Sequence, residues 1–266
     1  MILFIVTCVS TFLAGSGFGF HPPIWIDGLI YMGAVMAILL AHEMGHFLQA
    51  VRYHVPASLP YFLPMPISPF GTMGAVISMR GSNADRKELF DIGLTGPLAG
   101  LVVAIPIVAY GVATAEPFPL GVPTAGHYPD SLLVKFFMWL MRPDLEAGQE
   151  LSLSPLLQAG WVGLFITGLN MIPVSQLDGG HVAYALFGRN AHLLARLVVL
   201  AALLFIFTSG GEAFGLLVMV ALVLFIGVAH PPTADDTAPL GRGRRLIGLL
   251  SLAIPILCLS GLPTFR

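Results

Sequence analysis

Two histidines and a glutamate interrupt an otherwise apolar stretch, ILLAHEMGHFLQAV, at residues 38–51. His42, Glu43 and His46 form the pattern HExxH, which on a helix places both imidazoles on one face, where they can bind the same zinc ion. The glutamate beside the first histidine is placed to take a proton from an attacking water molecule. Ionisable groups in hydrocarbon are costly unless they are paired or bound to a metal, so the triplet predicts a metal site suited to hydrolysis.

The composition places this site inside a membrane protein. Of the 266 residues, 56% are hydrophobic and 10% are charged, and the mean hydropathy is +0.88. A soluble domain carries about 25% charged residues. The formal net charge of −2, with no long basic run, argues against binding of nucleic acid. Cys8 and Cys258 lie in separate apolar segments, which favours two small core residues over a disulfide.

Several segments are apolar and long enough to cross a bilayer as helices, which takes about 20 residues each. The first lacks the positive start and the cleavage site of a signal peptide and is predicted as a span, with a signal anchor as the alternative. In the longest polar connection, 115–155, the stretch SLLVKFFMWLMR predicts an amphipathic helix that lies on the membrane. The predicted spans are approximately 2–20, 29–51, 92–114, 156–173, 193–209, 213–229 and 245–263, with a tight turn, TSGGE, between the fifth and the sixth.

The basic residues orient these spans. With the N-terminus inside, nine of the 12 Lys and Arg residues fall in inside loops, and three fall outside. The positive-inside rule therefore favours a cytoplasmic N-terminus. The inside set is Arg52, Arg80, Arg86, Lys87, Arg189, Arg196, Arg242, Arg244 and Arg245, and the outside set is Lys135, Arg142 and Arg266.

Residues 57–81, between the second and third spans, cannot form a continuous helix because four prolines interrupt them: Pro60, Pro64, Pro66 and Pro69. The following GTMGAVISMR has two turn glycines and a short β-prone run. Such an apolar stretch is expected to dip back into the membrane against the helices. The predicted fold class is an all-α integral membrane protein, a polytopic bundle of about six to seven transmembrane helices with a short re-entrant β-hairpin between spans two and three.

A catalytic zinc usually takes three protein ligands and leaves one position for water. No third histidine extends the motif, because Gln49 and Arg52 stand where the longer pattern HExxHxxGxxH needs glycine and histidine. His54 is predicted as an interfacial residue. The strongest candidate for the third ligand is Asp178, in LNMIPVSQLDGGHVAY, which follows the fourth span. The second and fourth spans both end on the cytoplasmic side, so residues at their ends could share one metal.

Other assignments stay open from the residues alone. Asp178 could be a turn residue or a helix N-cap before GGHVAYALF. Glu88 and Asp91, in DRKELFD, are more typical of a solvated helix start, with Glu88 the next ligand candidate after Asp178. His181 could be a fourth ligand or a residue that orients one, but a plain polar neighbour is favoured.

The paired motifs resemble a known family. HEMGH in a membrane helix, followed two spans later by NMIPVSQLDGG, is similar to the site-2 proteases, intramembrane zinc metalloproteases with the motif N-x-x-P-x-x-x-L-D-G. The resemblance covers residues 29–187 and includes GPLAG at 96–100. Many relatives carry an asparagine where Gly100 stands, so the resemblance assigns no contact to that position here.

The resemblance implies a catalytic core of three spans that holds one Zn²⁺ per chain. It assigns His42, His46 and Asp178 as metal ligands and Glu43 as the base. It assigns to Asn170 a polarising or substrate-orienting role.

We therefore interpret the chain as a membrane-embedded zinc endopeptidase that hydrolyses a peptide bond within or near a transmembrane segment of a membrane-protein substrate, as in regulated intramembrane proteolysis. The alternative is a metal-ion transporter, which would carry ligands at several depths, whereas His192 and Glu212 lie at span edges. A catalytically dead scaffold is disfavoured by the intact motifs.

The predicted organisation has an N-terminal span and outside loop at 1–28, the catalytic core at 29–187 and C-terminal transmembrane helices at 188–266. The expected partners are the lipid bilayer and the protein substrate, with no nucleic acid. The expected location is a bacterial or archaeal cell membrane, with the active site open to the cytoplasm. The sequence does not set the oligomeric state.

A strand edge could hold the substrate. A protease must unwind a helical segment before it can cut it, and the freed backbone groups need new hydrogen bonds. An exposed strand edge supplies them through β-augmentation. We expect Ala75, Val76, Ile77 and Ser78 to pair with the extended substrate, and the alternative is a hairpin that only fills the helix bundle.

Overall fold

The structure is a computed structural model that describes residues 1–17, 24–79, 83–119, 131–146, 149–208 and 214–259. It is mostly helical, as predicted, with two small two-stranded sheets. Arg80, Glu212 and most of the predicted turn at 208–212 lie outside the described residues.

Three helices of the described chain are long and apolar enough to cross a membrane. The first two are α2 (Trp25–Arg52) and α3 (Arg86–Thr114), which match the second and third predicted spans. The third is the apolar stretch Asp178–Thr208, which comprises α6 (Asp178–Phe187), a short 3-10 turn, η2 (Gly188–Asn190), and α7 (Ala191–Thr208). Gly188, with a φ of +58°, ends α6. The chain is therefore built to span a bilayer.

The other predicted spans correspond to shorter helices. A helix rises about 1.5 Å per residue, so the 16 residues of α5 (Pro155–Asn170) fall short of a hydrocarbon layer of about 30 Å. The predicted last span is divided by a turn into α9 (Arg242–Ser251) and α10 (Ile254–Cys258). The first and sixth correspond to α1 (Ile2–Gly15) and α8 (Phe214–Ile226). The total number of spans stays a prediction.

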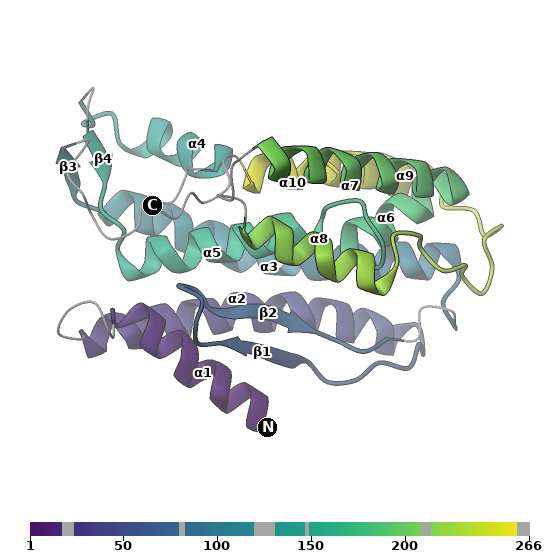
Figure 1. Cartoon of the computed structure of the whole chain (residues 1–266), viewed down its shortest axis with the longest axis horizontal. Coiled ribbons are helices and arrows are strands. Elements are labelled where there is room, and N and C mark those ends of the chain that lie inside the picture. Colours follow the sequence, from purple (N-terminus) through teal and green to yellow (C-terminus); the bar gives the residue numbers. More distant parts are fainter. Residues whose placement is uncertain (18–23, 80–82, 120–130, 147–148, 209–213, 260–266) are drawn as a thin grey trace.

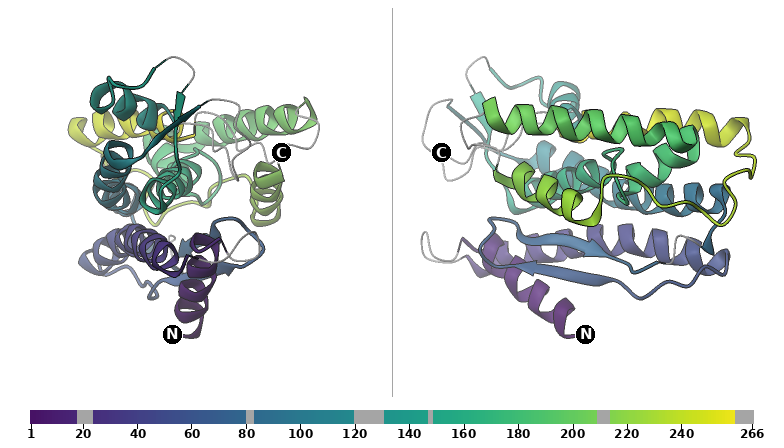
Figure 2. Two further views of the ribbon diagram at one scale, coloured as in Figure 1. Left: turned by 90° about the vertical axis from the view of Figure 1, so that its left-hand side faces the viewer. Right: turned by 45° about the vertical axis from the view of Figure 1, so that its right-hand side comes forward.

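Figures 1 and 2 show α1, α2 and the first hairpin on one side of the molecule and the later helices on the other. The two sides meet mainly where α2 packs on α3. Gly45 permits this approach, because a Cβ at that position would lie 2.6 Å from the carbonyl oxygen of Thr95. The Thr95 hydroxyl in turn donates to the Gly45 carbonyl at 3.1 Å. Small residues at the crossing thus bring the two backbones together, as is common in membrane helices.

The predicted hairpin is present between α2 and α3. It consists of β1 (Tyr61–Met65) and β2 (Gly71–Val76), which are antiparallel, and it packs against α1 and α2. Its turn is fastened to α2 by the Tyr31 hydroxyl, which donates to the carbonyl of Phe70 at 2.9 Å. Gly71 has a φ of +73°, and a Cβ there would lie 2.6 Å from the Ser10 carbonyl oxygen of α1. Both the turn and the close helix require glycine.

The polar connection between α3 and α5 holds the predicted amphipathic helix, α4 (Leu132–Met141). It also holds a sheet that the sequence did not indicate, β3 (Pro117–Pro119) paired with β4 (Gln149–Leu151). Strands of three residues are too short to show an alternating pattern. Arg142, directly after α4, ties this connection to the end of α3, because it donates to the carbonyl of Ala115 at 2.5 Å.

The other end of the bundle collects arginines from several elements. Arg86, at the start of α3, donates to the carbonyls of Ala185 and Leu186 at 2.5 and 3.2 Å, near the end of α6. Arg244, on α9, forms an ion pair with Asp91 of α3 at 2.8 Å. The segments that were predicted to lie inside therefore meet in space at one end of the helices.

Candidate metal centre

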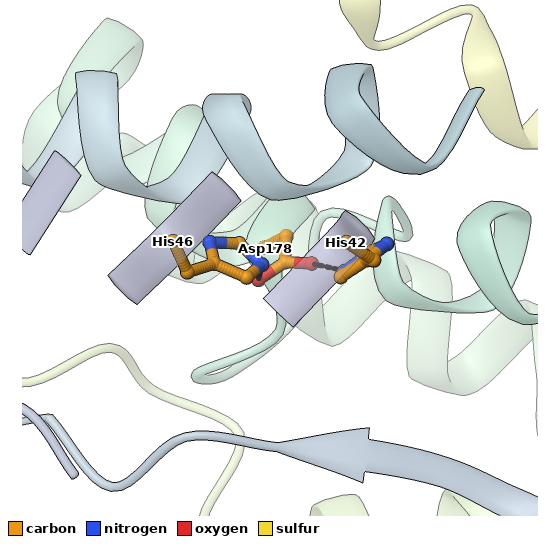
Figure 3. A group of neighbouring side chains, drawn as sticks. All are labelled: His42, His46 and Asp178. Atoms are coloured by element: carbon orange, nitrogen blue, oxygen red, sulfur yellow. Dashed lines mark hydrogen bonds and ion pairs between the residues drawn. The ribbon is translucent and has the colours of Figure 1, made fainter. Parts of the chain in front are cut away.

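The three predicted metal ligands lie together in the core. His42 and His46 come from the buried face of α2, and Asp178 is the first residue of α6. One ligand atom from each lies within 4.8 Å of the others. The Asp178 carboxylate is 3.1 Å from His42 Nε2 and 3.3 Å from His46 Nε2, and Figure 3 shows it between the two rings.

This spacing fits a tetrahedral ion. Zinc bonds of about 2.0–2.1 Å to nitrogen and oxygen place neighbouring ligand atoms about 3.3 Å apart. Both carboxylate–imidazole distances fall close to that value. The donor set, two imidazoles and one carboxylate, is also one that catalytic zinc sites use. Within the described chain, no other group of three such side chains could hold a metal.

A backbone carbonyl orients His46. Its Nδ1 lies 2.7 Å from the carbonyl oxygen of Ile92 on α3. A carbonyl accepts only, so Nδ1 carries a hydrogen, and Nε2, 3.3 Å from the Asp178 carboxylate, is the ring nitrogen left to bind a metal. Histidines that bind metals commonly donate their second N–H in this way.

Two glycines of α3 make room for the imidazoles. A Cβ on Gly96 would overlap the ring of His46, and a Cβ on Gly100 would lie 3.1 Å from His42 Nδ1. The sequence GPLAG thus presents a flat surface to α2. A larger residue at position 100 would crowd His42, because its Cβ alone would require the ring to shift by a few tenths of an ångström.

Glu43 and Asn170 flank the same group. Glu43 is buried on α2, directly after His42 in the sequence. Asn170, the last residue of α5, places its amide nitrogen 3.5 Å from His42 Nε2. Both therefore stand at the edge of the position that an ion would occupy.

The alternative ligands serve other purposes. Glu88 completes a capping box with Asp85 at the start of α3, where each side chain accepts from the other's backbone N–H. Asp91 accepts two hydrogen bonds from Arg244 and one from the hydroxyl of Tyr53. Burial, followed by contact with Asp91, raises the pKa of Tyr53 and keeps it a donor. Neither acid belongs to the metal group.

The remaining histidines near the motifs are also accounted for. His54 follows α2 with a φ of +56°, the left-handed conformation that often ends a helix. His181 lies one turn after Asp178 and does not join the group. Its Nδ1 is 2.7 Å from Nε2 of His230, a residue that the sequence motifs did not single out.

His230 anchors the chain after α8 to the helix that carries Asp178. Its Nδ1 lies 2.5 Å from the Pro231 carbonyl, so it donates there, and its Nε2 accepts from His181. Its ring stacks on Tyr184 at 4.5 Å between centroids. Burial lowers the pKa of His230, which favours this neutral form. No sequence spacing connects residues so far apart, which is why His230 was missed.

The predicted substrate strand is formed only in part. Ala75 and Val76 belong to β2 and pair with Phe62 and Tyr61 of β1. The strand ends at Val76. Both backbone groups of Ser78 are bonded to Ser58: the Ser78 N–H donates to Ser58 Oγ, and the Ser78 carbonyl accepts from the Ser58 N–H, each at 2.9 Å. Among the described residues, no third strand covers the outer edge of β2.

In the described residues, these features define a membrane protein with an HExxH helix and one largely buried His₂Asp group. The sequence model of peptidase family M50 matches residues 30–209. The chain therefore belongs to peptidase family M50, which includes the site-2 proteases. The predicted resemblance is confirmed.

Plant proteins are among its relatives. "Probable zinc metalloprotease EGY1, chloroplastic" of Oryza sativa subsp. japonica is 30% identical over 234 residues, 85% of this chain and 39% of the relative. The protein of the same name from Arabidopsis thaliana is 32% identical over 238 residues, which are 87% of this chain and 42% of the relative. "Probable zinc metalloprotease EGY2, chloroplastic" of Arabidopsis thaliana is 32% identical over 166 residues, 62% of this chain and 30% of the relative. The chain spans less than half the length of each.

Proposed function

We propose that this chain is a membrane-embedded zinc endopeptidase that cuts a peptide bond within or near a transmembrane segment of another membrane protein. The observation that carries the proposal is the geometry of His42, His46 and Asp178, whose ligand atoms lie within 4.8 Å of one another, with the carboxylate 3.1 and 3.3 Å from the two imidazoles. The family membership and the names of the relatives support it. The catalytic core is proposed as residues 29–187, with one zinc ion per chain.

The proposed roles of the other residues follow from their places. A bound zinc ion lowers the pKa of water and polarises the scissile carbonyl. Glu43, buried beside His42, takes the proton of the attacking water and passes it to the leaving amine. Asn170 orients the substrate, and its amide donates to the oxygen that becomes negative as water attacks.

The hairpin has a proposed role in holding the substrate. A Cβ on Gly74 would lie 3.5 Å from Ile166 of α5, so β2 lies against the helix that ends at Asn170. An unwound substrate beside the metal group would need partners for its backbone, and the edge of β2 that no described strand pairs with, near Ala75 and Val76, offers them. Because Ser58 engages Ser78, the proposed pairing centres on Ala75 to Ile77, with Ser78 at its limit.

The proposed orientation follows from the charges. The arginine-bearing ends of α2, α3, α6 and α9 meet at one end of the bundle, and the positive-inside rule assigns that end to the cytoplasm. Asp178 starts the helix that ends there. The site is therefore proposed to open to the cytoplasmic side of a bacterial or archaeal membrane.

Glu43→Gln tests this function. The variant keeps the size and hydrogen bonding of the side chain but cannot accept the proton, so it should bind zinc as the wild type does and fail to cut. Co-purification with uncut membrane proteins, each of which the wild-type protein cleaves, would identify substrates. A Glu43→Gln variant that still cleaves at a substantial rate would refute the role of Glu43. Zinc-dependent metal uptake into vesicles without proteolysis would favour the transporter instead.

A further inference from the structure

An open pocket of about 400 Å³, whose lining includes none of His42, His46 and Asp178, lies where the arginine-bearing ends of α2, α3 and α9 meet. Its lining combines two arginines, Arg52 and Arg244, with apolar side chains that include Leu98 and Ile247. Neither the family membership nor the proposed proteolysis accounts for this pocket. Its chemistry is polar and positive on one side and apolar on the other.

The positive side is well supplied with donors. Arg52 is exposed at the end of α2, and nothing in the described structure pairs with it. Asp91 holds Arg244 in place through Nε and Nη2, at 2.8 and 2.9 Å. An arginine has five N–H donors, so this ion pair fixes the guanidinium and leaves donors over.

The charge balance favours an anion. Asp91 is the one acidic side chain in the lining, against Arg52 and Arg244. Arg242 and Arg245, both exposed, add positive charge at the start of α9. The two lining arginines against one carboxylate give the lining a formal charge of +1. The start of α9 contributes its positive dipole end as well.

The apolar side continues beyond the pocket along two helices. On α3, Leu98 is 42% exposed, and Val102, one turn further on, is 72% exposed. On α9, Ile247 is 49% exposed and Leu250, one turn further on, is 65% exposed. These side chains lead away from the arginines along helices that enter the predicted hydrocarbon layer. A molecule with a negative head and a long apolar tail matches this order of surfaces.

We propose that this pocket binds one anionic phospholipid of the surrounding bilayer. The headgroup phosphate lies between Arg52 and Arg244, and one acyl chain follows Leu98 and Ile247. Basic pockets between transmembrane helices on the cytoplasmic side bind anionic headgroups for this reason. Because Asp91 fixes Arg244, and Tyr53 at the end of the metal-bearing helix α2 donates to Asp91, the lipid would fasten α2, α3 and α9 together.

The test is native mass spectrometry of the full chain in detergent with added lipid. Phosphatidylglycerol and phosphatidylcholine with the same acyl chains are compared by the fraction of protein that carries one lipid. The wild type should prefer phosphatidylglycerol. Arg52→Gln should weaken phosphatidylglycerol binding about fivefold, the effect of one basic side chain near the membrane surface, and leave phosphatidylcholine binding unchanged.

Matched variants separate the pocket from general surface charge. Arg52→Lys should retain most of the preference. Arg189→Gln removes an exposed arginine that does not line the pocket and should bind as the wild type does. Equal binding of the two lipids by the wild type, or unchanged phosphatidylglycerol binding in Arg52→Gln, would overturn the proposal. So would an equal loss in Arg189→Gln. Binding of glycerol phosphate as tight as that of phosphatidylglycerol would assign the pocket to a soluble phosphate instead.

Discussion

Gly96→Ala should remove zinc from the protein without unfolding it. The new methyl group would overlap the ring of His46 at Nε2, the atom assigned to the metal. Unbonded heavy atoms settle about 3.5 Å apart, so the ring must retreat by at least about 1 Å. Metal–ligand distances tolerate only about 0.2 Å. The retreat would therefore break the bond from His46 to the metal.

The size of the effect can be bounded. Changes to residues that only orient a metal ligand cost about 10–100-fold in affinity. Loss of the ligand itself should exceed that, so we expect zinc affinity to fall by more than about a hundredfold. The measurement is competition for zinc between the purified protein and a chromophoric chelator. Folding is followed in parallel by thermal unfolding in detergent.

Two other glycines serve as controls. Gly33 lies on α2 with open space around its missing Cβ, so Gly33→Ala should leave zinc affinity unchanged. Alanine in a helix should also add about 0.5–1 kcal/mol of stability there. Gly100→Ala should have an intermediate effect, because His42 needs to move by only a few tenths of an ångström from 3.1 Å. Wild-type zinc affinity in a folded Gly96→Ala variant would refute the proposed geometry.

Three further outcomes are expected. Asn170→Ala should keep its zinc and lose about 10²–10³-fold in turnover, the usual cost of one oxyanion donor; loss of zinc or of folding would make the residue structural. Val76→Pro removes one backbone donor from β2, so it should slow cleavage of a helical substrate more than of one loosened by helix breakers, and equal rates for wild type and variant would rule out the strand. Because burial lowers the pKa of His230 in the folded protein, the unfolded chain binds more protons below about pH 6.5, and stability should fall as the pH falls below that value. The His230→Phe variant should lose part of this dependence of stability on pH. It keeps the other groups around the ring, which are His181, His192, Tyr184 and Asp236. If the variant's stability changes with pH as the wild type's does, the pH dependence belongs to another group.

The sequence predicted the metal group because each part of it has a local signature. HExxH fixes the geometry of two ligands within one helical turn, and NMIPVSQLDGG contains the third. The hairpin was predictable as well, because prolines exclude a helix at 57–81 and Gly71 marks the turn. Periodicity and turn residues determine structure over only a few neighbouring residues, so both can be recognised directly in the sequence.

The rest depends on contacts between distant segments. The carbonyl of Ile92 that orients His46, the partner of His181 at His230, and the pairing of Arg244 with Asp91 leave no local pattern. The apparent seventh span was read from composition, which does not show that α9 and α10 are separated by a turn. Hydropathy measures how apolar a segment is, whereas helix length is decided by packing and by turns.

The zinc content of the purified protein tests the central claim most directly. Elemental analysis should find about one zinc per chain in the wild type and in Glu43→Gln, since a tetrahedral catalytic site uses three protein ligands and one open position. Asp178→Ala, which removes the carboxylate 3.1 Å from His42 Nε2, should lose most of the metal while the protein stays folded. Full zinc retention in Asp178→Ala would contradict the assignment of His42, His46 and Asp178 as the metal site.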